Sequence, residues 1–155
     1  MNTRFLLIAQ GLILLTLLSV GGVSVTSAES TPPVKKYYVQ DIKDAMHRHI
    51  KNHADDDGIF RLKDEKTNEI LELEFVKIHN PVRQINDYIY FACTDFRVHN
   101  EPRKLYDLDF WMDTETGELR IYQTKIHKEP RKSLIYGWYK QPRYTFVNDT
   151  VVPLY

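Results

Sequence analysis

Only one stretch of this sequence, residues 39–53, repeats its apolar side chains at the three- and four-residue spacing of an α-helix. Val39, Ile42, Met46 and Ile50 mark that spacing. Acidic residues stand near its start and basic residues near its end, as the helix dipole favours. After a turn signal at Gly58, apolar and polar residues alternate as in half-buried strands. One helix followed by strands predicts an α+β fold.

The alternating part predicts an antiparallel meander. Strands are expected at residues 59–63, 69–79, 84–98, 104–112 and 118–127, with a break at Pro130 and a last hairpin formed by 134–139 and 143–147. We expect the helix to lie across one face of a curved antiparallel sheet of about four to five strands. This arrangement is a cystatin-like shape.

The N-terminus predicts export. Arg4 precedes a nearly continuous apolar run over residues 5–25, and Thr26, Ser27 and Ala28 form a small-residue cleavage site. The run is about long enough to cross a bilayer, so an uncleaved anchor is the alternative. We therefore expect a signal peptide at 1–28, a flexible leader at 29–36 and a single α+β domain at 37–155. The domain would be periplasmic or secreted, with no membrane contact after cleavage.

Charge and composition narrow the function. The chain has 21 basic and 21 acidic residues, and this balance argues against a nucleic-acid binder. Its single cysteine excludes an internal disulfide and a multi-cysteine metal site. The sequence has no Gly-rich phosphate loop and no nucleophile–base pair at a recognisable spacing. A non-enzymatic binding or interaction module without a cofactor is therefore the first hypothesis.

The alternation of side chains between the two faces of each strand suggests where such a module would bind. Four-residue loops at 99–102 and 114–117 would place Phe91 opposite Phe110 and Cys93 opposite Leu108, on an apolar face against the helix. Cys93 is then expected to be a core residue. The opposite, open face would carry carboxylates, aromatic rings and one arginine: Tyr90, Asp107, Asp109, Trp111, Arg120 and Tyr122.

Carboxylates surrounded by aromatic rings suit a cationic or sugar-like small ligand. Two other readings of this face stay open. Asp109 would only pair with Arg120 or Tyr122 within the protein, or Asp107 or Asp109 would act as the general base of a small enzyme. The face would also suit a periplasmic protein partner or a second copy of the chain.

A metal site is a separate possibility. His49 and His53 are four residues apart on one face of the expected helix, which is a usable spacing for two metal ligands. Both also border the apolar stripe, so half-buried packing explains them without a metal ion.

Four short stretches resemble a group of small exported bacterial proteins of unknown function. They are YFACTDF at 90–96, YDLDFW at 106–111, TKIHK at 124–128 and PRYT at 142–145. The resemblance implies bacterial export and a compact helix-on-sheet domain. It identifies no catalytic residue.

Overall fold

Helix α1 (Val39–His53) has the bounds that its periodicity predicts. The computed structural model describes residues 35–154, so the predicted signal peptide and most of the predicted leader lie outside the described residues. At the start of α1, the backbone N–H of Tyr38 donates to Asp41 Oδ2 at 2.8 Å. The helix buries Ile42, Met46 and Ile50. Within residues 35–154, no helix combines the length and apolar character needed to cross a membrane.

The strands confirm an α+β fold, but the expected four to five strands were too few. The main antiparallel sheet has seven strands in the order β1-β2-β4-β5-β6-β7, with β3 paired to β4. Their bounds are β1 (Ile59–Lys63), β2 (Ile70–Ile78), β3 (Arg83–Gln84), β4 (Ile89–Val98), β5 (Glu101–Asp113), β6 (Arg120–Ser133) and β7 (Gly137–Pro142). A separate hairpin joins β8 (Tyr144–Val147) to β9 (Thr150–Pro153).

Part of the additional sheet comes from strand β6, which continues through Pro130. The predicted break at this proline is wrong, because Pro130 pairs with Lys140 of β7. Beyond Lys128, β6 is paired with β7 alone. A residue without a backbone N–H is tolerated where one side of a strand needs no ladder hydrogen bond.

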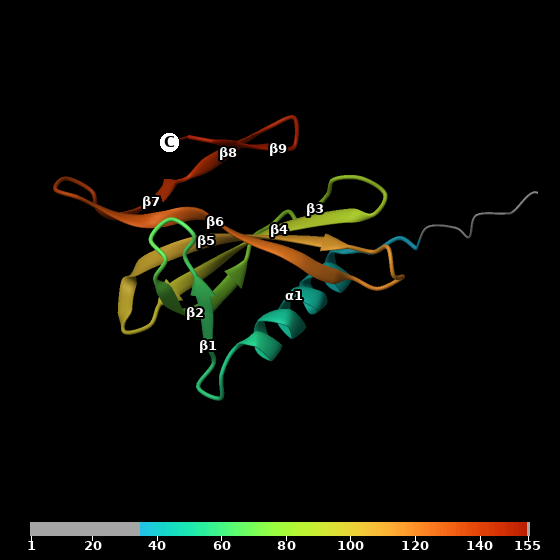
Figure 1. Cartoon of the computed structure of the whole chain (residues 1–155), viewed down its shortest axis with the longest axis horizontal. Helices are drawn as coiled ribbons and strands as arrows, with labels where there is room; N and C mark the ends of the chain where they lie inside the picture. Colours follow the sequence, from blue (N-terminus) through green and yellow to red (C-terminus); the bar gives the residue numbers. More distant parts are fainter. Residues whose placement is uncertain (1–34, 155) are drawn as a thin grey trace, which may run out of the picture. The chain divides into compact units, whose positions relative to one another are not determined.

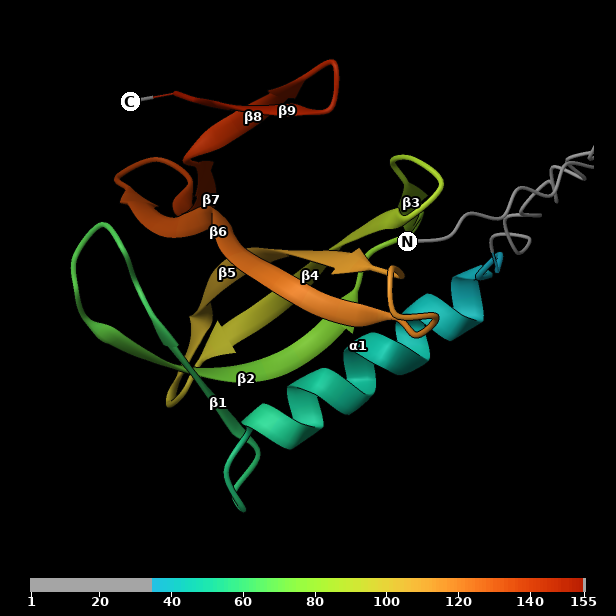
Figure 2. The same ribbon diagram turned by 45° about the vertical axis from the view of Figure 1, so that its right-hand side comes forward.

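Helix and C-terminal hairpin lie on opposite faces of the curved sheet (Figure 1, Figure 2). The helix covers an apolar core that includes Leu73, Phe96 and Phe110. On the other face, Tyr144 and Phe146 pack with Phe91 and Trp111 in a second cluster. The described strands and α1 all belong to one compact unit, Pro33–Tyr155.

The pairing of β4 with β5 differs from the predicted register by one residue. The connecting turn is short: β4 ends at Val98, β5 begins at Glu101, and Asn100 takes a positive φ of 61°. A bulge beside the turn then places Cys93 opposite Asp109. One residue of slip moves every side chain of a strand to the other face. Cys93 therefore lies on the face away from the helix, and its predicted place beside Leu108 in the core was wrong.

Candidate functional site

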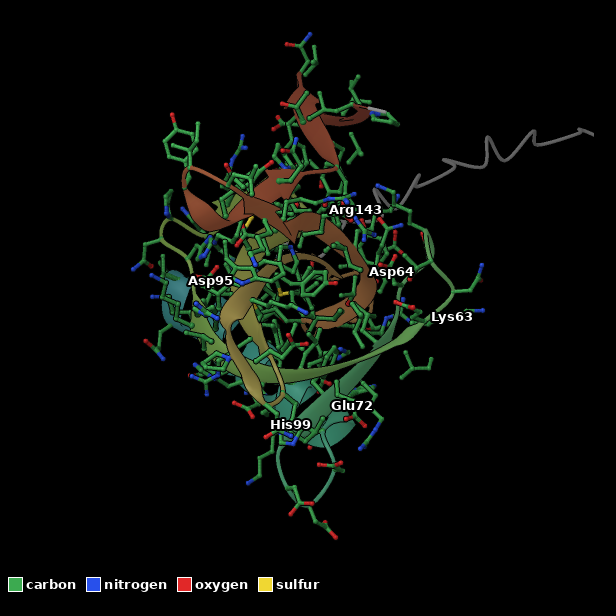
Figure 3. All side chains as sticks on the ribbon, turned by 90° about the vertical axis from the view of Figure 1, so that its left-hand side faces the viewer. Lys63, Asp64, Glu72, Asp95, His99 and Arg143 are labelled. Carbon is green, nitrogen blue, oxygen red and sulfur yellow. The ribbon has the colours of Figure 1, made fainter. Side chains whose placement is uncertain are left out.

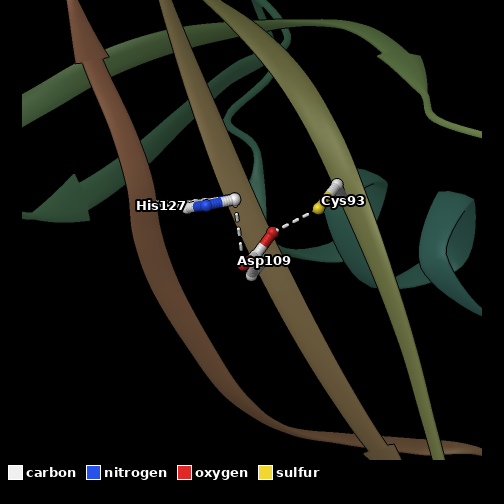
Figure 4. Close-up of side chains that lie close together, drawn as sticks. All are labelled: Cys93, Asp109 and His127. Carbon is white, nitrogen blue, oxygen red and sulfur yellow. Dashed lines mark hydrogen bonds and ion pairs between the residues drawn. The ribbon is translucent and has the colours of Figure 1, made fainter. Parts of the chain in front are cut away.

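Cys93, Asp109 and His127 come together from strands β4, β5 and β6 (Figure 4). The Cys93 thiol donates a hydrogen bond to Asp109 Oδ1 at 2.5 Å, and His127 Nδ1 is 3.4 Å from Asp109 Oδ2. One potential ligand atom from each residue lies within 4.8 Å of the other two. Asp109 is fully buried, whereas Cys93 is half-buried. The carboxylate therefore lies beneath a thiol and an imidazole that are closer to solvent.

Local irregularity in β6 positions the histidine. Leu108 pairs with Ile126 but Asp107 pairs with Lys128, so His127 is the extra residue of a bulge. Such a bulge re-aims a side chain. The imidazole stacks on the ring of Tyr144, with centroids 4.7 Å apart. Among the described residues, no hydrogen-bond partner reaches buried Nδ1 of His127.

Asp109 accepts its hydrogen bonds from neutral groups. The second donor is the Tyr144 hydroxyl, 2.7 Å from Oδ2. Burial and the charge of Asp109 raise the pKa of the Cys93 thiol well above its usual value. The same two causes raise the pKa of the Tyr144 hydroxyl. A nucleophilic cysteine needs a lowered pKa, so this environment does not activate the thiol.

A second acidic cluster lies nearby on the same face and already contains a cation. Lys140 Nζ is 2.6 Å from both Asp95 Oδ1 and Asp107 Oδ1, and Lys128 Nζ is 2.7 Å from Asp107 Oδ2. His79 Nε2 lies 3.0 Å from Asp95. Burial opposes the charge of Asp107, but hydrogen bonds that include those from both lysines outweigh it and hold its pKa below its usual range. Lysine ammonium groups therefore take the place of a metal ion in this cluster.

Arg143 anchors the start of β8 to the rest of the domain through ion pairs. Its guanidinium donates to both oxygens of Asp64, at 2.7 and 2.6 Å, and to Glu129 Oε2 at 2.6 Å. Arg143 and Asp64 lie side by side in Figure 3. All three side chains are largely buried. The next residue, Tyr144, is thereby held over Asp109.

Three of the predicted ligand-binding residues share the face expected of them, but that face is covered. Asp107, Asp109 and Trp111 all point away from the helix and are all buried. The hairpin β8–β9 packs on Trp111 through Phe146. This surface was predicted to be open, but the C-terminal hairpin folds over it.

The other three predicted residues lie elsewhere. Tyr90 faces the helix and its hydroxyl accepts from the Tyr37 backbone N–H at 3.2 Å, so placing it beside the two aspartates was wrong. Arg120 pairs with Asp113 at 2.9 Å, and Tyr122 is exposed. The alternative in which Asp109 pairs with Arg120 or Tyr122 was also wrong, because Asp109 bonds Cys93 and Tyr144.

His49 and His53 do lie together, with ring centroids 4.0 Å apart. His53 Nδ1 is 2.8 Å from the His49 carbonyl oxygen, and the His49 ring packs edge-on against Phe110. Burial, followed by the neighbouring His53, lowers the pKa of His49 to about 4. In the described part of the chain, three or more potential metal-ligand side chains gather in only two places, and neither includes this helix pair.

His127, Tyr144 and Lys140 were not among the predicted site residues. Most of the site could nevertheless have been located from short stretches of the sequence. The four short stretches at 90–96, 106–111, 124–128 and 142–145 supply most of the clustered side chains: Cys93, Asp95, Asp107, Asp109, His127, Lys128, Arg143 and Tyr144.

The face of the sheet away from the helix, called the outer face below, thus holds two clusters. One is a lysine–aspartate network, and the other combines a thiol, a carboxylate and an imidazole.

In comparisons with family models, with curated proteins and with solved structures, no match to this chain is found.

Proposed function

We propose that this chain is an exported, non-enzymatic binding protein that holds a divalent transition metal ion through Cys93, Asp109 and His127. The observation that carries the proposal is the convergence of sulfur, oxygen and nitrogen ligand atoms from three adjacent strands within 4.8 Å. A rigid sheet holds ligands more precisely than loops do.

The ligand set favours zinc or a similar ion. Thiolate, imidazole and carboxylate together suit Zn²⁺ and its neighbours, whereas Ca²⁺ and Mg²⁺ prefer oxygen ligands alone. Ligand atoms on one tetrahedral zinc lie about 3.4–3.6 Å apart at the usual bond lengths. The Cys93 sulfur is 2.5 Å from Asp109 Oδ1, so the two must separate by about 1 Å to admit the ion.

Charge balance also supports the proposal. Asp109 is fully buried, and its two hydrogen-bond donors, Cys93 and Tyr144, are neutral. A buried carboxylate without a cation is costly. A divalent ion that displaces the thiol proton would meet one thiolate, one carboxylate and one neutral imidazole, giving a net charge of zero.

Access and coordination number fit a binding role. Cys93 is half-buried, and the His127 side chain is 14% exposed, so the ion would enter from their side. Three protein ligands leave a fourth position for water or for an external ligand.

The competing functions have less support. A general base at neutral pH needs a raised pKa, whereas that of Asp107 is lowered. The pair His49 and His53 offers two ligands without a clustered third. A cystatin-like arrangement and a periplasmic location remain parts of the proposal, supported by the helix-on-sheet order and by the predicted signal peptide.

Cobalt substitution tests the proposal. The purified protein, reduced and metal-free, is titrated with Co²⁺ and then with Zn²⁺. We expect one equivalent of Co²⁺ to give a thiolate-to-cobalt charge-transfer band that Zn²⁺ abolishes. The band should be absent in Cys93→Ala and strongly weakened in His127→Gln.

A matched control uses the other histidine pair. His49→Gln combined with His53→Gln should leave the cobalt band unchanged, and circular dichroism should confirm that every variant is folded. Absence of the band in the folded, reduced protein would contradict the proposal, as would an unchanged band in His127→Gln.

A further inference from the structure

The turn between β6 and β7 exposes three consecutive apolar side chains. Leu134 is 104% exposed, Ile135 82% and Tyr136 81%. The hairpin projects beyond the rest of the sheet (Figure 1). Isolated exposed apolar residues are ordinary, but a contiguous group of them marks an interaction site.

This turn is well defined. Ser133 Oγ accepts from the backbone N–H groups of Ile135 and Tyr136, at 3.2 and 3.3 Å. Gly137 closes the turn with a positive φ of 70°, a conformation that other residues adopt at a cost. Behind the turn, Ser133 pairs with Gly137 across the two strands. The apolar side chains are thus displayed by an ordered turn, so ordering it on contact costs little entropy.

The hairpin behind the turn is cationic and aromatic. Arg131 and Lys132 stand beside the tip and are exposed, and Arg131 pairs with Glu129. Lys140 is turned to Asp95 and Asp107 on the sheet, so Lys132 is the cation nearest the tip that is free to meet a charged surface. Lys132 is exposed and pairs across the strands with Trp138. The Lys104 ammonium of β5 lies over the Trp138 ring, 4.9 Å from its centroid. Tyr139 is exposed on the same hairpin.

We propose that this hairpin tip, Leu134 to Tyr136, inserts into the surface of an anionic phospholipid bilayer. Aliphatic side chains at a projecting tip would enter the acyl region, and tyrosine and tryptophan favour the headgroup level. The exposed ammonium of Lys132 beside the tip would be attracted to anionic headgroups. A flat protein partner would leave a narrow projecting wedge poorly packed, so the bilayer is the better fit to this shape and charge.

This contact is independent of the proposed metal site. It departs from the expectation that the domain has no membrane contact after cleavage of the signal peptide. Surface insertion of a hairpin tip needs no spanning helix.

Vesicle cosedimentation tests the inference with residues 29–155, which include the whole compact unit Pro33–Tyr155 and lack the apolar run at 5–25. Vesicles contain phosphatidylethanolamine with phosphatidylglycerol, or phosphatidylcholine alone. We expect binding to the anionic vesicles, reduced at least tenfold in Leu134→Ser/Ile135→Ser. Lys132→Gln should weaken binding about fivefold on anionic vesicles and little on phosphatidylcholine.

Ile70→Ser is the matched control, because Ile70 is an exposed isoleucine outside the hairpin. It should bind anionic vesicles like the unchanged protein. Failure of the unchanged protein to bind these vesicles would overturn the inference. Equal binding by the Leu134→Ser/Ile135→Ser variant would overturn it too. Self-association that depends on Leu134 and Ile135, without vesicle binding, would assign the tip to a protein contact instead.

Discussion

The thiol of Cys93 donates a hydrogen bond to the buried carboxylate of Asp109, with 2.5 Å between sulfur and oxygen. The contact joins central strands β4 and β5 on the face away from the helix. It fixes the protonation of the single cysteine in the metal-free protein, because a carboxylate favours the thiol over the thiolate.

Thiol labelling should therefore be slow. Reagents attack the thiolate, and burial together with Asp109 raises the pKa of Cys93. At about pH 8, metal-free folded protein should react at least about tenfold more slowly than the same protein unfolded in urea. Asp109→Asn should react faster than the unchanged protein, because the carboxylate charge is gone. Equal rates for folded and unfolded protein would contradict the prediction.

Lys140 should be essential for stability. Its ammonium pairs with the carboxylates of both Asp95 and Asp107, which are buried. Lys140→Met should lower the free energy of unfolding by about 3–5 kcal/mol, because it leaves buried charge without its nearest cation. Urea denaturation at neutral pH measures the change.

Lys77→Met provides the comparison for that variant. Lys77 also faces Asp95, but at 3.8 Å and with its side chain 66% exposed. The decrease in the free energy of unfolding caused by Lys77→Met should stay within about 0.5 kcal/mol. Similar losses in the two variants would show that burial of the ion pair does not decide its contribution.

Acid should weaken the Asp64–Arg143 contact. Hydrogen bonds from Arg143 are the largest cause that holds the pKa of Asp64 below its usual value. As pH falls below about 4, the unfolded chain binds a proton at Asp64 before the folded protein does, so the free energy of unfolding falls. Asp64→Asn should be less stable at neutral pH, and the difference should shrink as pH falls. Urea denaturation between about pH 2.5 and pH 7 tests this, and a constant difference would contradict it.

His49 should make the stability of the protein depend on pH at higher pH values than Asp64 does. Its pKa falls from the usual 6.5 to about 4 in the folded protein. Between these values the unfolded chain binds the proton and the folded protein does not, so stability is lost as pH falls from about 6.5 to about 4. Allowing for partial solvent exposure, we expect a loss of about 1–2 kcal/mol that is absent in His49→Gln. An NMR titration of His49 with a midpoint near 6.5 would contradict the cause.

The helix and the first strand could be predicted because local pattern alone determines them. Residues 39–53 and 59–63 have the predicted bounds. The composition of the site depended on the pairing register of β4 with β5, and a turn shorter or longer by one residue changes that register. The turn at Asn100 and its neighbouring bulge moved Cys93 from the core to the outer face. Asparagine tolerates positive φ, so the shorter turn had a signal in the sequence.

No local pattern in the sequence predicts that the hairpin β8–β9 covers the face of the sheet away from the helix. Tyr144 and Phe146 read as strand residues, and nothing in their spacing shows which surface they will cover. The surface they cover depends on the contacts of Arg143 with Glu129 and with Asp64, which is 79 residues away in the sequence. Likewise, the match of Lys140 to Asp95 and Asp107 depends on β7 adding to the sheet after Pro130.

Arg143 and Asp64 are 79 residues apart, and their contact links the end of β1 to the start of β8. This contact can form only after Arg143 has become available to the rest of the domain. If residues 1–28 direct export as predicted, a chain that emerges N-terminus first lacks Arg143 and Tyr144 until strands β1 to β7 have crossed the membrane. In a chain that folds as it emerges, the covering of Asp109 by Tyr144 would then be one of the last steps of folding.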